Sequence, residues 1–190
     1  MEPPESMFIE AFAVIFTLLS VWLTIKRHVL SWPTGLFAVS FYTLVFWQSK
    51  LYSDFGLQFI FFGQGIYGAF HWWKNREDKV HAKIGVMTPL ERTFWICIGI
   101  WFYLMIAFLM YFYTDAVAPW VDSFVATFSL IANWLLAQRK IENWVIWIIV
   151  DIIYIALFAY KGLYLSSGLY FILLILAIKG FKNWEKCLAV

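Results

Sequence analysis

The segment NWVIWIIVDIIYIALFAY, residues 143–160, decides the fold of this chain. It contains one charged side chain, Asp151, and a helix that crosses the hydrocarbon core of a bilayer needs about 20 mainly apolar residues. The whole chain has the same character, with 63% apolar and 14% charged residues among 190 and a mean hydropathy of +0.76. Soluble domains hold about 45–50% apolar and 25% charged residues. The chain therefore has lipid as its solvent.

Seven segments are long and apolar enough to span a bilayer. They are residues 8–25, 32–48, 55–73, 93–113, 119–138, 143–160 and 163–181. The sequence thus predicts an all-α integral membrane protein with seven transmembrane helices. The net charge of +2 is no sign of nucleic-acid binding, because the basic residues sit in short runs between apolar blocks.

The basic residues are distributed unevenly between the two sides of the membrane. If the segments alternate in direction, one side holds Lys26, Arg27, Lys74, Arg76, Lys79, Lys83, Arg92, Arg139, Lys140, Lys179, Lys182 and Lys186. The other side holds only Lys50 and Lys161. Cytoplasmic loops collect Lys and Arg. This bias predicts a plasma-membrane protein with its N-terminus outside and its C-terminus in the cytoplasm.

The chain contains an internal repeat, visible without gaps at an offset of 112 residues. Matching pairs include Phe16/Phe128, Trp22/Trp134, Arg27/Arg139, Trp32/Trp144, Tyr42/Tyr154, Phe46/Phe158, Gly56/Gly168, Gly68/Gly180, Trp72/Trp184 and Lys74/Lys186. Shared hydrophobicity would align Leu and Phe by accident, but it would not as easily align Trp, Gly and loop Arg in one register.

The repeat predicts a 3+1+3 arrangement of the helices. We expect a first three-helix repeat at 8–75, a cytoplasmic loop and linker helix at 76–118, and a second repeat at 119–187. Because the linker helix restores the starting side, the two repeats should be parallel, as in the SWEET-like transporters. Transporters built from such repeats bind substrate near the middle of the membrane, at the repeat interface.

Asp151 is the clearest candidate for a binding residue. An ionisable side chain inside the bilayer costs at least about 2.5–3.5 kcal/mol on insertion scales, so it usually faces a partner or a cavity. Trp144, Trp147 and Asp151 share one helix face, which Tyr154 extends. Two indoles near a carboxylate suit a flat cation. The alternatives are that Trp144 is an interfacial anchor, and that Asp151 stays protonated or bonds to another helix.

Two further helices carry polar side chains. Residues 55–73 offer Gln64, Tyr67 and His71 on one face, with Gln58 earlier, although nearby glycines indicate that part of this face serves helix packing. We expect His71 itself to be solvated near the cytoplasmic loop.

Residues 119–138 offer Ser129 and Asn133, one turn apart. Asn133 could equally bridge two helices without touching a substrate. No arrangement of Ser, His and Asp, no metal motif around Cys97 or Cys187, and no phosphate loop is visible, so neither an enzyme nor a cofactor is expected.

With these features in place, the chain resembles the Pnu family of bacterial vitamin transporters over nearly its whole length. Trp144, Trp147 and Asp151 fit the family's WxxWxxx[N/D] motif. Gln58, followed by Tyr67-Gly68 and Trp72, fits its Q…YG…W motif. The typical member carries nicotinamide riboside (PnuC), and a variant carries thiamine (PnuT).

The resemblance implies facilitated diffusion of an unphosphorylated vitamin into the cytoplasm, where a kinase traps it by phosphorylation. It also implies homo-oligomers, with trimers expected, and a binding site that includes the motif residues. Nicotinamide riboside carriers tend to read YGW and to have Asn at the motif's last position. Here Ala69 follows Gly68 and the last position is Asp151, which favours thiamine, with nicotinamide riboside as the alternative.

Two other functions fit the sequence less well. A non-transporting membrane subunit would need neither an internal repeat nor Asp151. A proton-coupled carrier would use Asp151 or Glu10 as the relay.

Overall fold

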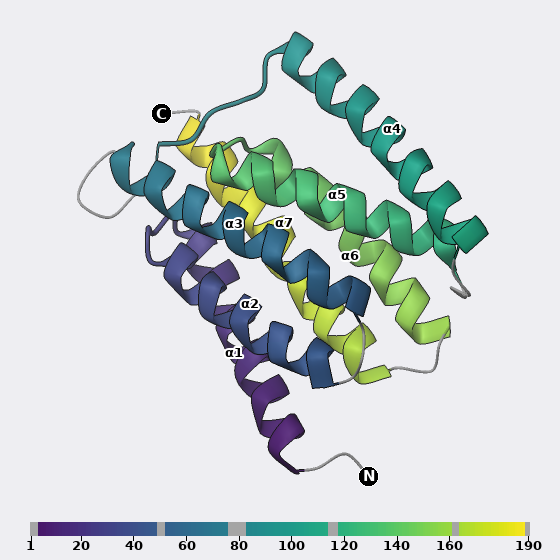
Figure 1. The fold of residues 1–190 in the computed structure, drawn as a ribbon. Coiled ribbons are helices and arrows are strands. Elements are labelled where there is room, and N and C mark those ends of the chain that lie inside the picture. The colour runs from purple at the N-terminus through teal and green to yellow at the C-terminus, as the bar shows by residue number, and fades with distance from the viewer. Residues whose placement is uncertain (1–3, 49–51, 76–82, 114–117, 161–163, 189–190) are drawn as a thin grey trace. The chain divides into compact units, whose positions relative to one another are not determined.

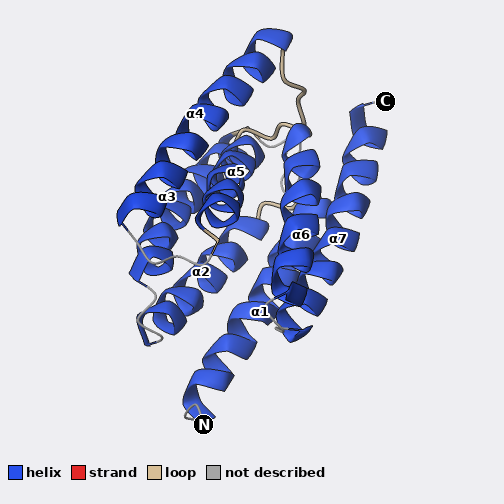
Figure 2. Ribbon diagram, turned by 90° about the vertical axis from the view of Figure 1, so that its right-hand side faces the viewer, coloured by secondary structure: helices blue, strands red, loops and turns tan. Residues whose placement is uncertain are grey.

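The computed structural model describes residues 4–48, 52–75, 83–113, 118–160 and 164–188. They form α1 (Pro4–Ile25), α2 (Ser31–Gln48), α3 (Tyr52–Lys74), α4 (Pro89–Tyr113), α5 (Pro119–Ala137), α6 (Glu142–Tyr160) and α7 (Tyr164–Leu188). Figure 1 follows these helices along the chain, and Figure 2 shows no strand among the described residues. The predicted all-α, seven-helix fold is confirmed.

The helices differ in how strongly their composition favours a membrane. Four described helices, α1, α4, α5 and α6, are apolar and long enough to cross one. The predicted end of the last helix at residue 181 falls short, because α7 continues to Leu188 through a basic final stretch. Four residues used in the charge argument, Lys50, Arg76, Lys79 and Lys161, lie outside the described residues.

The chain divides into two compact units. The first comprises residues 1–83 together with 137–139, and the second comprises 84–136 and 140–190. In the first unit, α2 packs against both α1 and α3. Phe16 of α1 lies 5.4 Å from Phe37 of α2 between ring centroids, and Phe12 lies 5.7 Å from Phe41. Aromatic rings therefore bind α1 to α2.

In the second unit, α4 lies along α5 and α6 packs against α7 (Figure 1). Gly99 brings α4 close to α5, because a side chain there would collide with Ile131. Met87, Ile131 and Leu135 form a small buried core, with Trp95 packed against it. The linker helix α4 therefore packs with the helices that follow it in the chain.

The segment before α4 is docked on the α5–α6 connection of the same unit. Thr88 and Glu91 cap the start of α4 reciprocally, each side chain accepting from the other's backbone N–H. Three contacts dock the segment: Ile141 N–H to the Gly85 carbonyl at 3.0 Å, Met87 N–H to the Glu142 carboxylate at 2.9 Å, and the Lys140 ammonium to the Glu91 carboxylate at 3.0 Å. These bonds hold the N-terminal end of α4 in place.

Each repeat ends its first helix in the same unusual way. Arg27 after α1 and Arg139 after α5 are the two described non-glycine residues with positive φ, at 58° and 63°. Amides then bond carbonyls five residues back, at 2.9 Å in both repeats: His28 to Leu23, and Lys140 to Leu135. This is the backbone pattern of a Schellman helix end. The arginines matched by the sequence repeat are thus matched in backbone conformation.

A buried pair of indoles follows in each repeat. In the first repeat, Trp32 of α2 meets Trp72 of α3 edge-on, with ring centroids 5.6 Å apart at 82°. The Trp32 ring also fills the space beside Gly68, where no side chain would fit. We call this arrangement the Trp–Gly–Trp cluster of the first repeat.

The second repeat has the same Trp–Gly–Trp cluster. Trp144 of α6 meets Trp184 of α7 edge-on at 5.5 Å and 87°, beside Gly180. Trp72 and Trp184 are both fully buried. The repeat seen in the sequence therefore has a structural counterpart inside each unit. The parallel orientation of the two repeats stays a prediction.

Gly180→Ala should destabilise the protein. A methyl group at this position would lie 2.6 Å from the Trp144 ring, and the buried indole would have to move. Overpacking a core typically costs about 1–3 kcal/mol, and the lower end applies to one methyl group. Thermal unfolding in detergent would measure the loss. Gly168→Ala, on the same helix and with no atom within 4 Å of the added group, is the matched control and should unfold no earlier than wild type.

Candidate functional site

Two members of the predicted α6 face are occupied in helix packing. Trp144 is 3% exposed and belongs to the Trp–Gly–Trp cluster. Tyr154 packs 4.4 Å from Tyr170 of α7 and stacks on Phe158 at 5.5 Å. Both rings therefore have protein partners that account for their burial without a ligand.

The other two members have no such partners. The carboxyl group of Asp151 is 3% exposed, and within the described part of the chain it forms no hydrogen bond or ion pair. Trp147 is half-buried, and its indole has no ring or hydrogen-bond partner among those same residues. The two residues lie one helical turn apart. A buried acceptor without a donor is costly, so Asp151 marks a place where a partner is expected to bind.

Three polar side chains on α5, between Thr127 and Asn133, are candidates for the site. Ser129 is buried and Asn133 is half-buried, and the amide of Asn133 already has a partner. Thr127, which the sequence analysis did not select, is 3% exposed, and its hydroxyl has no partner in the described residues. The signal that could have identified it is the repeat, because the equivalent position in the first repeat is Ile15.

Helix α3 carries the candidate site residues of the first unit. Gln58 is buried and its amide has no hydrogen bond within the described residues, whereas Gln64 is half-buried and already bonded. Tyr67 is 37% exposed. Trp72 belongs to the Trp–Gly–Trp cluster, so its place in the family motif has a packing explanation.

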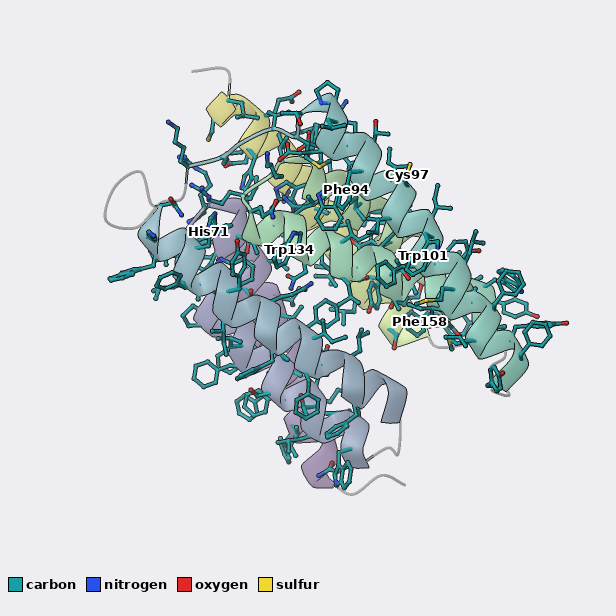
Figure 3. All side chains as sticks on the ribbon, turned by 45° about the horizontal axis from the view of Figure 1, so that its top comes forward. His71, Phe94, Cys97, Trp101, Trp134 and Phe158 are labelled. Carbon is teal, nitrogen blue, oxygen red and sulfur yellow. The ribbon has the colours of Figure 1, made fainter. Side chains whose placement is uncertain are left out.

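The expectation that His71 is solvated is met only in part. Its ring is half-buried and stacks on Tyr67, with centroids 5.5 Å apart and planes at 16°. Nε2 of His71 lies 3.4 Å from the guanidinium of Arg139, and Nδ1 lies 3.4 Å from the Asn75 amide. Figure 3 places His71 near the C-terminal end of α3. The helical spacing of Tyr67, His71 and Asn75 brings these groups together, which charge counting along the sequence could not show.

The internal repeat separates framework residues from candidate site residues. Each residue of the Trp–Gly–Trp cluster is identical in the two repeats, as is Tyr154 with Tyr42. Ser129 corresponds to the similar residue Thr17 in the other repeat. The remaining candidates differ from the residue at the matched position in size or charge; the pairs are Trp147 and Gly35, Asp151 and Val39, Asn133 and Val21, Gln58 and Tyr170, Gln64 and Leu176, and Tyr67 and Lys179. Residues that hold the helices together are needed in both repeats, whereas a residue that binds the substrate is needed in only one of them.

The unpartnered groups indicate what kind of ligand would suit them. An indole face attracts a flat cation, by about 2 kcal/mol or more when water is excluded. A carboxylate one turn away can neutralise such a cation or accept hydrogen bonds from a diol. The Thr127 hydroxyl on α5 of the same unit can also donate and accept hydrogen bonds. These groups suit binding and orientation, and no nucleophile paired with a base occurs among them.

A family model described as nicotinamide mononucleotide transporter matches residues 7–186. The chain belongs to this family. The resemblance to the Pnu transporters is thereby confirmed, and the protein is a multi-pass membrane transporter and not an enzyme.

Curated relatives share about a quarter of their residues with the chain. The nicotinamide riboside transporter PnuC of Escherichia coli (strain K12) is 26% identical, over 93% of this chain and 84% of its own length. The PnuC of Neisseria mucosa is 24% identical, over 96% and 73%. The riboflavin/roseoflavin transporter RibM of Streptomyces davaonensis is 23% identical, over 90% and 81%.

A solved structure has the same fold. The crystal structure of the vitamin B3 transporter PnuC superposes with a TM-score of 0.77 at 23% identity, covering 95% of this chain and 81% of the other. None of the relatives reported above is named for thiamine. The expected preference for thiamine therefore gains no support from them.

Proposed function

We propose that this transporter carries nicotinamide riboside into the cytoplasm by facilitated diffusion. The observation that carries this proposal is the buried carboxyl group of Asp151, which has no partner in the described residues and lies one turn from the unpaired indole of Trp147. Nicotinamide riboside has a flat cationic ring for the indole and a ribose diol for the carboxylate. Two of the relatives above are named for this vitamin.

In this proposal, Trp147 and Asp151 of α6 hold the ligand, and polar groups on α5 of the same unit add contacts. Those groups are Thr127, Ser129 and Asn133. In the first unit, taken by itself, the residues proposed to contact the vitamin are Gln58, Gln64 and Tyr67 of α3, which the family motif and the helical spacing select. Trp144, Trp72 and Tyr154 act indirectly, by holding the helices in register. A passive carrier only equilibrates its substrate, so a cytoplasmic kinase that phosphorylates the vitamin would make uptake directional.

Thiamine is the second candidate, and specific residues favour it. Ala69 stands where nicotinamide riboside carriers tend to have Trp, which leaves room for a different ring. Asp151 supplies a full negative charge, which suits a permanent cation. Since both vitamins are flat cations, charge alone barely separates them.

The test is a binding titration of the purified protein, followed by Trp fluorescence, with nicotinamide riboside, thiamine and riboflavin. We expect nicotinamide riboside to bind most tightly. Uptake into proteoliposomes should run down the vitamin gradient, and the final internal concentration should equal the external one with or without an imposed pH gradient. Stronger binding of thiamine would select the second candidate. Accumulation driven by protons would replace facilitated diffusion with a coupled mechanism.

A further inference from the structure

Arg139 belongs to the second repeat by its place in the sequence, but its side chain contacts residues at the end of α3. It follows α5, but it belongs to the first compact unit. Its Nη1 donates a 3.0 Å hydrogen bond to the carbonyl of Asn75, just after α3, and its Nη2 lies 3.4 Å from His71 Nε2. No carboxylate pairs with this guanidinium in the described residues. Its charge is therefore directed at the end of α3.

The contact with His71 defines the state of that ring. Arginine is always charged and only donates, so Nε2 of His71 must offer a lone pair to it. The proton of the neutral ring then sits on Nδ1. Asn75 does not accept that proton, because the amide Nδ2 that lies near the ring is itself a donor and donates to the His71 carbonyl at 2.8 Å. The ring is thus held by Arg139 at its Nε2 edge and by Tyr67 on its face.

Tyr67 is the next residue along this chain of contacts. Its ring stacks on that of His71, one turn away on α3. Burial lowers the pKa of Arg139, and the negative charge that Tyr67 carries only when ionised opposes that shift. Arg139, His71 and Tyr67 are consequently one mechanically connected set.

We propose that Arg139 is a positioning residue for Tyr67: through His71, it fixes Tyr67 in the orientation in which this side chain contacts the vitamin. This inference rests on the proposed function, because Tyr67 contacts a ligand only under that proposal. A positioning role makes Arg139 important for affinity although it need not touch the vitamin. The simpler role, capping the carbonyls at the end of α3, would affect stability alone.

Arg27 is a matched control for the backbone. Both arginines end a helix in the left-handed conformation, with φ of 58° and 63°. Glycine adopts this conformation at no steric cost, so Arg139→Gly and Arg27→Gly remove the side chain without straining the turn. Any difference between the two variants reports on what the arginine side chain contacts.

The experiment is a double-mutant cycle on vitamin affinity, with nicotinamide riboside as the probe and Trp fluorescence as the signal. Coupled contacts commonly change affinity by about tenfold, and we expect this loss for Arg139→Gly. In a His71→Ala background, Arg139→Gly should add no further loss. Arg27→Gly should change affinity less than about twofold. If His71→Ala does not fold, His71→Phe keeps a ring on Tyr67 while removing the acceptor nitrogen.

Three outcomes would overturn the positioning role. The first is an undiminished loss from Arg139→Gly when His71 is already replaced, which would mean that the two residues act independently. The second is an equal loss from Arg27→Gly, and the third is wild-type affinity in Arg139→Gly. If the wild-type protein binds none of the three vitamins, the proposed function fails and the positioning role fails with it. Wild-type binding together with an unaffected Arg139→Gly removes the positioning role alone.

Discussion

Trp147→Ala should weaken vitamin binding by about 30- to 150-fold, while folded protein remains recoverable in detergent. Stacking of a flat ring on an aromatic side chain is worth about 1–3 kcal/mol, and a cation over a desolvated indole is worth about 2 kcal/mol or more. We expect a loss of about 2–3 kcal/mol, the upper half of the stacking range, which corresponds to the 30- to 150-fold weakening. Trp147 has no ring partner in the described residues, so its removal disrupts no indole pair in the fold. Isothermal titration would measure the change.

Two other tryptophans serve as controls for this prediction. Trp101 on α4 is 58% exposed, and Trp101→Ala should leave affinity unchanged. Figure 3 labels Trp101 on α4, together with Cys97 on the side of that helix away from α5. Trp144→Ala should behave in the opposite way, lowering the unfolding temperature because it empties the Trp–Gly–Trp cluster. Wild-type affinity in Trp147→Ala would remove the indole from the site.

Asp151→Ala should lower the affinity for the vitamin by about 10- to 150-fold. Hydrogen bonds to charged groups contribute about 1.5–3 kcal/mol, and alanine removes both the charge and the acceptor oxygens. Val39→Ala, at the equivalent position of the first repeat, is the matched control and should bind normally. Equal affinity in wild type and Asp151→Ala would mean that the carboxyl group has only a structural role.

The pH dependence of binding should carry the signature of Asp151. A cationic ligand favours the ionised carboxylate, so affinity should rise as pH increases and the carboxyl group loses its proton. Below that range, binding should release protons into solution. Asp151→Asn should bind with a flat pH profile. If the ligand is nicotinamide riboside, the amide can still bond the ribose and the loss at neutral pH should be small. A large loss at neutral pH would favour thiamine.

Much of the fold could be predicted because the membrane restricts the choices. Backbone groups in lipid must be satisfied within a helix or a closed barrel, so apolar runs of the right length fix the seven helices. The apolar runs do not fix where each helix ends. Helix α7 extends to Leu188 because Lys182 and Lys186 can lie beyond the lipid while the helix continues. The prediction that the N-terminus lies outside and the C-terminus in the cytoplasm rests on charge asymmetry alone and stays a prediction. The oligomeric state also stays a prediction.

The site was partly predictable for a similar reason. Asp151 stood out because a charge in an apolar run needs a partner. Trp144 and Trp147 looked alike in the sequence, because the helical periodicity places both on one face of α6. Periodicity cannot show that the Trp144 ring packs against Trp184 of α7. Contacts between segments distant in sequence, such as Arg139 with His71, have no local signal. Thr127 was missed because a single Thr in a helix is ordinary.

The two Trp–Gly–Trp clusters also have an evolutionary consequence. A duplicated gene begins with two identical copies, and each residue of the frame is then under selection in both. Gly35 and Trp147, or Val39 and Asp151, stand at matched positions of the two repeats and differ, whereas the residues of the neighbouring clusters are identical. Such a lineage can exchange one vitamin for another through a few substitutions in a single copy, while the duplicated frame is inherited intact.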